Sequence, residues 1–108
     1  CNSSKTPIFS INSCVSVPSS SEVSLRNAVT VSPVTVQING DAWGLMYYSG
    51  GIYDGSDCND YDINHSLTII GYDYEIEFDS NMNPYNVTYW KGVNSFGTSW
   101  GEAGTVRL

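Results

Sequence analysis

The chain has 108 residues, enough for one small domain with a modest hydrophobic core. Its net charge is −7 and it carries four Lys and Arg residues in all, so no basic patch can form, and nucleic acid and anionic membranes are poor partners. The longest apolar run, around Ile69-Ile70, is far too short to span a membrane.

The first third of the chain predicts an irregular segment followed by a short helix. Residues 1–20 are rich in Ser, Asn and Pro. Ser19 lies three residues before Glu22, which is the spacing of a capping box. A partial apolar stripe at helical spacing then predicts a helix over 21–30, and Pro33 ends it.

The middle of the chain predicts one strand, one helical turn and one acidic loop. Residues 34–38 alternate apolar and polar side chains, as a half-buried strand does. Residues 41–49 concentrate aromatic and aliphatic side chains and predict a helical turn. The acidic loop 54–62 invites a calcium-site hypothesis, but it lacks the central Gly and closing Glu of an EF-hand. A solvated loop without metal is therefore expected.

The last third predicts the remaining strands of an antiparallel, β-rich unit. Strands are expected at 65–72, 87–93 and 104–108. Between the first two, the acidic and polar segment 73–86, which contains Pro84, predicts an exposed hairpin excursion. No internal repeat or linker divides the chain, so the fold class is α+β within one unit.

Two stretches carry the residues that could perform chemistry. Segment 94–104 holds three glycines and two aromatics, so its backbone can turn tightly and approach other groups closely. A surface turn pinned by a buried Trp is the alternative. His65, the single histidine, begins a predicted strand. A lone histidine is more often a packed or surface residue than a catalyst.

Together these stretches resemble the papain-like (cathepsin-like) cysteine peptidases, and the resemblance runs essentially from Cys1 to Leu108. Six motifs match in order and spacing: Asn64-His65-Ser66, Gly71-Tyr72, Tyr89-Trp90, Asn94-Ser95-Phe96-Gly97, Trp100-Gly101-Glu102 and Gly104. Upstream, the segments 33–36 and 48–53 also fit. The resemblance implies the C-terminal, β-rich, barrel-like half of a papain-like fold with one short helix. The N-terminal half and the final strands would lie outside residues 1–108.

The resemblance implies roles for three residues. His65 would take the proton from a cysteine thiol, and the resulting imidazolium would protonate the leaving amine. Asn94 would accept a hydrogen bond from the imidazole and orient it. Phe96 stands where the family has Trp, and would form a smaller lid over the His–Asn hydrogen bond.

Further positions would line the substrate cleft. Trp100 matches a tryptophan of the primed side, with a core aromatic as the alternative. The main specificity pocket would be lined by Gln37, Ile63, Asn64 and Ser66. Gln37 could equally be a surface strand residue. The segment Lys91-Gly92-Val93 departs from the family pattern, because a mid-strand Gly weakens a strand.

The three cysteines, Cys1, Cys14 and Cys58, are disulfide candidates, since an odd count suggests a partner outside the chain. By resemblance, Cys1 would bridge to the N-terminal half, and Cys58 to a residue beyond Leu108. Cys14 has counterparts in some family members. Glycosylation sequons begin at Asn2, Asn64 and Asn86. Cysteines and sequons together favour the secretory pathway, with a lysosomal, vacuolar or extracellular destination.

The resemblance implies a cysteine endopeptidase that needs neither metal nor cofactor and acts on peptide or protein substrates. Its nucleophilic cysteine would be supplied by the N-terminal half, from the same precursor or a separate chain, because no cysteine here matches it. The alternative is an inactive papain-like homologue with a structural or binding role. A free-standing adhesive or lectin-like domain would leave the six motifs unexplained.

Overall fold

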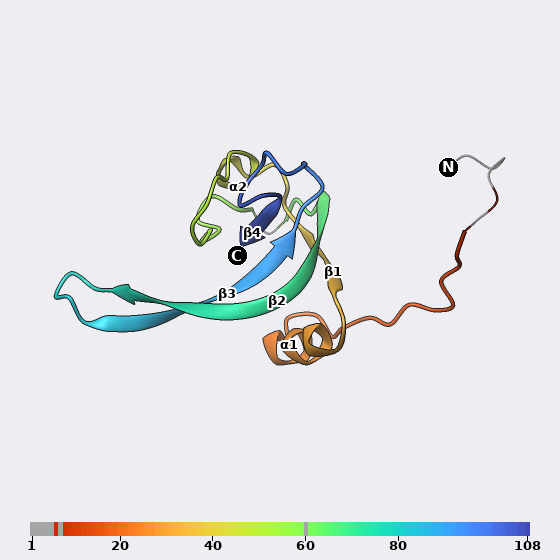
Figure 1. The fold of residues 1–108 in the computed structure, drawn as a ribbon, viewed down its shortest axis with the longest axis horizontal. Coiled ribbons are helices and arrows are strands. Elements are labelled where there is room, and N and C mark those ends of the chain that lie inside the picture. The colour runs from red at the N-terminus through yellow and green to blue at the C-terminus, as the bar shows by residue number, and fades with distance from the viewer. Residues whose placement is uncertain (1–5, 7, 60) are drawn as a thin grey trace.

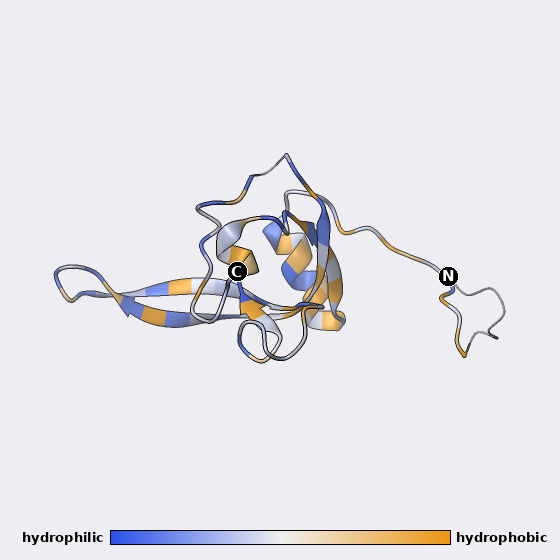
Figure 2. Cartoon of the chain, turned by 90° about the horizontal axis from the view of Figure 1, so that it is seen from above, coloured by the Kyte–Doolittle hydropathy of each residue, from blue (hydrophilic) through white to orange (hydrophobic). Residues whose placement is uncertain are grey.

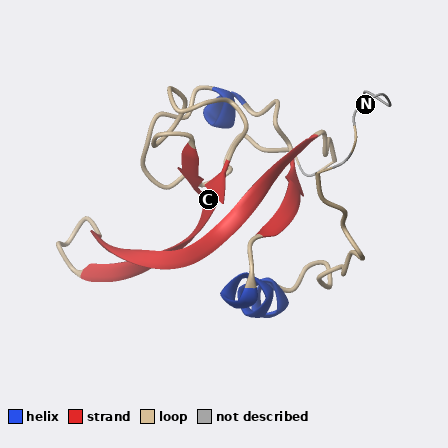
Figure 3. Cartoon of the chain, turned by 45° about the vertical axis from the view of Figure 1, so that its right-hand side comes forward, coloured by secondary structure: helices blue, strands red, loops and turns tan. Residues whose placement is uncertain are grey.

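The computed structural model describes residues 6, 8–59 and 61–108. Its elements follow in the order α1 (Glu22–Val31), β1 (Val34–Ile38), α2 (Trp43–Met46), β2 (His65–Phe78), β3 (Pro84–Val93) and β4 (Thr105–Arg107). The four strands form one antiparallel sheet in the order β1-β2-β3-β4 (Figure 1). The α+β class is thus confirmed. The sheet is open rather than barrel-like, and the four-residue helix α2 is the helical turn predicted within 41–49 (Figure 3).

Helix α1 forms where the apolar stripe predicted it, but the predicted cap was wrong. Ser21, not Ser19, is the N-cap, and its hydroxyl accepts a hydrogen bond from the Ser24 N–H at 3.2 Å. The chain turns at Ser20, whose φ is +56°, so helical backbone begins only at Glu22. Glu22 is therefore the first helical residue, two positions too early for its side chain to close a capping box.

Strands β2 and β3 extend further than the sequence analysis expected. The ladder between them runs from Thr68↔Val93 to Phe78↔Pro84, so most of segment 73–86 is regular strand with a short turn at 79–83. Acidic residues there alternate with apolar ones, a period of two that indicates strand despite the charge. Pro84 sits at the first strand position, where its missing N–H is tolerated. A bulge between Ile69 and Gly71 bends β2.

The core joins the helices to the centre of the sheet. Its buried members are Val29, Ala42, Leu45, Tyr48, Leu67, Ile69 and Val106. Gly92 faces this core, and a Cβ there would lie 2.8 Å from Leu67 Cδ1. The larger neighbours therefore fill the space that Gly92 leaves, and Gly92 pairs with both Ile69 of β2, beside the bulge, and Val106 of β4.

Several sequence expectations concern the loops and cysteines. Residues 54–59 and 61–62 form a loop, Asp60 lies outside the described residues, and no group of three metal-ligating side chains forms within the described ones. Cys14 and Cys58 are exposed thiols that form no disulfide with each other, whereas Cys1 lies outside the described residues. Within the same residues, no helix is long and apolar enough to cross a bilayer.

Candidate active site

The site begins with two side chains brought together by the ends of neighbouring strands. His65 is the first residue of β2, and Asn94 directly follows the last residue of β3. Because the strands are antiparallel, these two positions meet at the same end of the sheet. His65 Nε2 lies 2.8 Å from Asn94 Oδ1, and Asn94 is 9% exposed. The buried amide therefore holds the imidazole through one short hydrogen bond.

The hydrogen bonds around Asn94 also determine which histidine nitrogen carries the proton. The backbone N–H of Ser95 donates to Asn94 Oδ1 at 2.8 Å, and a donor requires the oxygen rather than the NH₂ at that position. The same oxygen faces His65 Nε2, so Nε2 must be the donor in that pair. Nδ1 of the neutral ring then holds the lone pair that can accept a proton.

The Phe96 ring covers the imidazole, and the Trp100 ring packs against Phe96. Phe96 stacks on the imidazole with ring centroids 5.0 Å apart, and it remains 45% exposed. Trp100 meets Phe96 edge-on at 5.5 Å. The Trp100 indole N–H donates to the backbone carbonyls of Leu45 and Met46, each at 3.1 Å. Trp100 is partly buried at the edge of the core, so it anchors the loop to α2 while it supports Phe96.

Loop 94–104 holds its shape through glycines and a charged anchor. Gly101 has a φ of +57°, and a Cβ there would lie 2.6 Å from the Thr105 carbonyl oxygen. Arg107 donates to both oxygens of the Glu102 carboxylate at 2.7–3.1 Å, and the Gly51 N–H donates to it at 3.1 Å. These hydrogen bonds, chiefly those from Arg107, lower the pKa of Glu102 below its usual value. The predicted tight turns are thus present.

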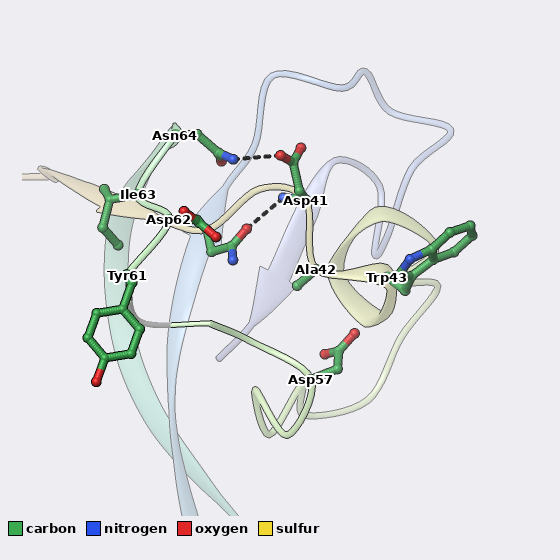
Figure 4. A pocket seen from close by; sticks show the side chains of 9 residues that line it. Asp41, Ala42, Trp43, Asp57, Tyr61, Asp62, Ile63 and Asn64 are labelled. Carbon is green, nitrogen blue, oxygen red and sulfur yellow. Dashed lines mark hydrogen bonds between the residues drawn. The ribbon is translucent and has the colours of Figure 1, made fainter.

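A second loop, residues 39–41, packs closely against the Cβ atom of His65, and the sequence analysis did not predict this contact. A Cβ on Gly40 would lie 2.5 Å from His65 Cβ, so only a residue without a side chain fits this approach. The Asn64 side chain holds the loop. Its oxygen accepts from the Gly40 N–H at 2.8 Å. Its NH₂ donates to Asp41 at 2.7 Å, as Figure 4 shows. The Asn39-Gly40 dipeptide, a common turn signal, was the available clue.

The predicted pocket residues fall into two separate hollows. Ile63 and Asn64 line a hollow beside Asp41, together with Trp43 and Tyr61 (Figure 4). Gln37 lines a different hollow, between the segment 14–22 and the outer side of α1 and β1. Ser66 is paired with Gln37 in the ladder. Because side chains alternate along β2, Ser66 points to the face opposite the imidazole.

Comparison with known proteins finds relatives along the whole chain. The sequence model of the papain family cysteine proteases matches residues 1–108. Zingipain-2 of Zingiber officinale is 39% identical over 99% of this chain and 44% of its own length. Procathepsin L of Mus musculus is 32% identical over 87% of the chain and 27% of its own length.

Solved structures agree in fold. The bromelain protease of Ananas comosus, in complex with the E64 inhibitor, superposes with a TM-score of 0.66 at 38% identity, over 84% of this chain and 37% of that one. The proform of the ragweed pollen allergen Amb a 11, a cysteine protease, gives a TM-score of 0.67 at 35% identity, over 85% and 23% of the two chains. The chain therefore spans less than half the length of the relatives that it matches.

Proposed function

Since this chain belongs to the papain family of cysteine proteases, we propose that it forms the C-terminal, β-rich part of a cysteine endopeptidase and contributes His65 and Asn94 to the active site. The observation that carries this proposal is the 2.8 Å bond between His65 Nε2 and the buried Asn94 Oδ1, under the Phe96 ring. A histidine held by an orienting group is the base of a nucleophilic pair.

In this mechanism His65 receives and returns one proton. Nδ1 takes the thiol proton of a cysteine that lies outside these 108 residues, which leaves a thiolate beside an imidazolium. The thiolate attacks the carbonyl carbon of the scissile peptide bond, and the imidazolium gives its proton to the departing amine. Asn94 accepts from Nε2–H throughout, so the ring cannot rotate away from the reacting atoms.

The substrate-binding part of the proposal rests on two walls of the site. We assign the subsite next to the catalytic pair to Ile63 and Asn64; Gln37 and Ser66 lie on the opposite face of the sheet and are not assigned to this subsite. Phe96 and Trp100 form the aromatic wall, which suits the leaving-group side of a peptide.

The proposed cellular route is the secretory pathway, with a lysosomal, vacuolar or extracellular end point. The exposed thiols of Cys14 and Cys58 suit disulfides to segments outside this chain in an oxidising compartment. Mapping of disulfide-linked peptides in the whole protein tests this, and free thiols at both positions would argue against it.

The test of the enzyme uses the whole protein that contains this chain. Peptide hydrolysis is measured together with active-site titration by a thiol-directed irreversible inhibitor. We expect turnover and stoichiometric labelling, both lost in His65→Ala. If the folded protein neither hydrolyses peptides nor reacts with the inhibitor, the proposal of an active enzyme is wrong, and an inactive homologue with a structural or binding role takes its place.

A further inference from the structure

A long two-stranded arm projects from the sheet, and the proposed activity does not use it. The arm comprises β2 residues 72–78, the turn 79–83 and β3 residues 84–90. Pairing with β1 ends at Ile69, and pairing with β4 begins at Lys91, with backbone hydrogen bonds between Trp90 and Leu108, so the arm beyond Trp90 has no third strand among the described residues (Figure 1). A lone two-stranded hairpin is at best marginally stable in water, so contacts from outside the arm, such as those of Arg107 with Glu75 and of Arg26 with Tyr72, contribute to its stability.

The two faces of the arm differ sharply in charge. One face, here called the uncharged face, carries Tyr72, Tyr74, Ile76 and Phe78 from β2 and Pro84, Asn86, Thr88 and Trp90 from β3. The opposite face carries Asp73, Glu75 and Glu77. Figure 2 shows the resulting alternation of apolar and polar residues along the arm.

The uncharged face is a large exposed apolar patch. Tyr74, Ile76 and Phe78 are 56%, 57% and 59% exposed. With Tyr72, which is 46% exposed, these four side chains present on the order of 400 Å². A patch of this size is among the largest that monomeric soluble proteins expose, and such patches often have a function.

The sequence places a glycan acceptor within this patch. Asn86-Val87-Thr88 is a sequon, Asn86 is exposed, and it stands directly opposite Ile76. Its neighbours along the ladder on the same face are Tyr74 and Phe78, at diagonal positions that large side chains can span. We propose that Asn86 is N-glycosylated and that the proximal sugars lie over Tyr74 and Phe78, covering the uncharged face.

The other sequons fit this role less well. The Asn64 amide already bonds to Gly40 and Asp41 beside His65, so a glycan there would break the loop that supports the histidine. Asn2 lies outside the described residues. Asn86 pairs with Ile76, which lies eleven residues after His65 in β2. Eleven residues of extended strand span about 35 Å. A glycan there leaves the catalytic pair free.

The chemical step is a transfer of oligosaccharide from a lipid diphosphate donor. The Asn86 Nδ2 atom attacks C1 of the first sugar and loses one proton. The bond between C1 and the diphosphate oxygen breaks, and the lipid diphosphate leaves with the bonding electrons. No oxidant or reductant takes part. The sugar C–H faces then pack on the aromatic rings while the hydroxyls face water.

The test compares two variants, Thr88→Ser and Thr88→Ala, whose side chains differ by one hydroxyl group. The whole protein is directed into the endoplasmic reticulum of a eukaryotic host, and glycosylated sites are labelled by peptide N-glycosidase in H₂¹⁸O. We expect ¹⁸O-labelled aspartate at position 86 in the wild type and in Thr88→Ser, which keeps the sequon. Thr88→Ala removes the sequon and should lose one glycan. No label at position 86 in folded wild type, or an unchanged glycan count in Thr88→Ala, would overturn the proposal.

The covering role has its own readout, which does not depend on peptidase activity. Thr88→Ala should bind more of a hydrophobic dye than Thr88→Ser and elute as larger species in size-exclusion chromatography. Adding Phe78→Ser to Thr88→Ala should reverse both changes, because it removes an exposed ring. Peptide hydrolysis should be equal in the two Thr88 variants. Equal dye binding and equal size would show that the glycan does not cover this face.

Discussion

Asn94→Ala is the most direct test of how the site is built. The change removes an acceptor that lies 2.8 Å from both His65 Nε2 and the Ser95 N–H. A hydrogen bond from a group that becomes charged during turnover is worth about 1.5–3 kcal/mol. The variant should therefore lose roughly 10- to 150-fold in kcat, with KM nearly unchanged. His65→Ala should lose more, because it removes the base and costs about 10²–10⁴-fold.

Asn94→Asp is the matched control, because it keeps both interactions of Oδ1. The Asn94 NH₂ group has no hydrogen-bond partner among the described residues, so this change breaks no existing bond there. It adds a negative charge beside the imidazole, which favours the protonated ring. We expect the alkaline limb of the pH–rate profile to move to higher pH.

Stopped-flow and steady-state peptide hydrolysis across pH, with circular dichroism to verify folding, measure these effects. Wild-type kcat in a folded Asn94→Ala protein would show that Asn94 does not orient the base. An unshifted pH profile in Asn94→Asp would show that the amide does not face the imidazole during turnover.

Three further predictions concern the surroundings of the pair. Phe96→Ala should lower kcat by admitting water to the His–Asn bond, whereas Phe96→Trp should keep or raise it; equal rates in both would remove the shielding role. Gln37→Ala should leave kcat/KM unchanged across a peptide panel, because Gln37 is exposed on the sheet face opposite the imidazole; a raised kcat/KM for substrates with Phe or Leu would show that Gln37 does contact the substrate. Glu102→Gln should lower Tm at pH 7. The folded pKa of Glu102 lies below its usual 4.5, so its stabilisation is present above about pH 4.5 and disappears as the pH falls through the folded value. Thermal melts should therefore show a smaller acid-induced fall in Tm in Glu102→Gln than in wild type.

The sequence by itself determined the elements with a clear period. The alternation at 34–38 and the stripe at 21–30 reflect which side chains must be buried, and both elements formed within a residue of the expected bounds. The motifs around His65 and Asn94 also identified the family, because residue type and order survive without coordinates.

The sequence analysis failed where local chemistry had two solutions. Ser19 and Ser21 are both competent caps, and only the turn at Ser20 selected between them. The acidic segment after Tyr72 forms the hairpin that was expected, but its charge hid how far regular strand extends, and only the pairing with β3 sets that length. The charge of a segment does not predict whether it forms strand, because the backbone hydrogen bonds of a strand depend on its partner strand.

Only the tertiary structure revealed the contacts that hold the histidine. Gly40 touches His65 from 25 positions upstream, and the pairing of β1 with β2 creates that contact. The same pairing places Gln37 and Ser66 on the face opposite the imidazole. The register between β2 and β3 places Ile76 directly opposite Asn86. Such neighbours depend on strand register, because a shift of one residue would turn every side chain to the other face.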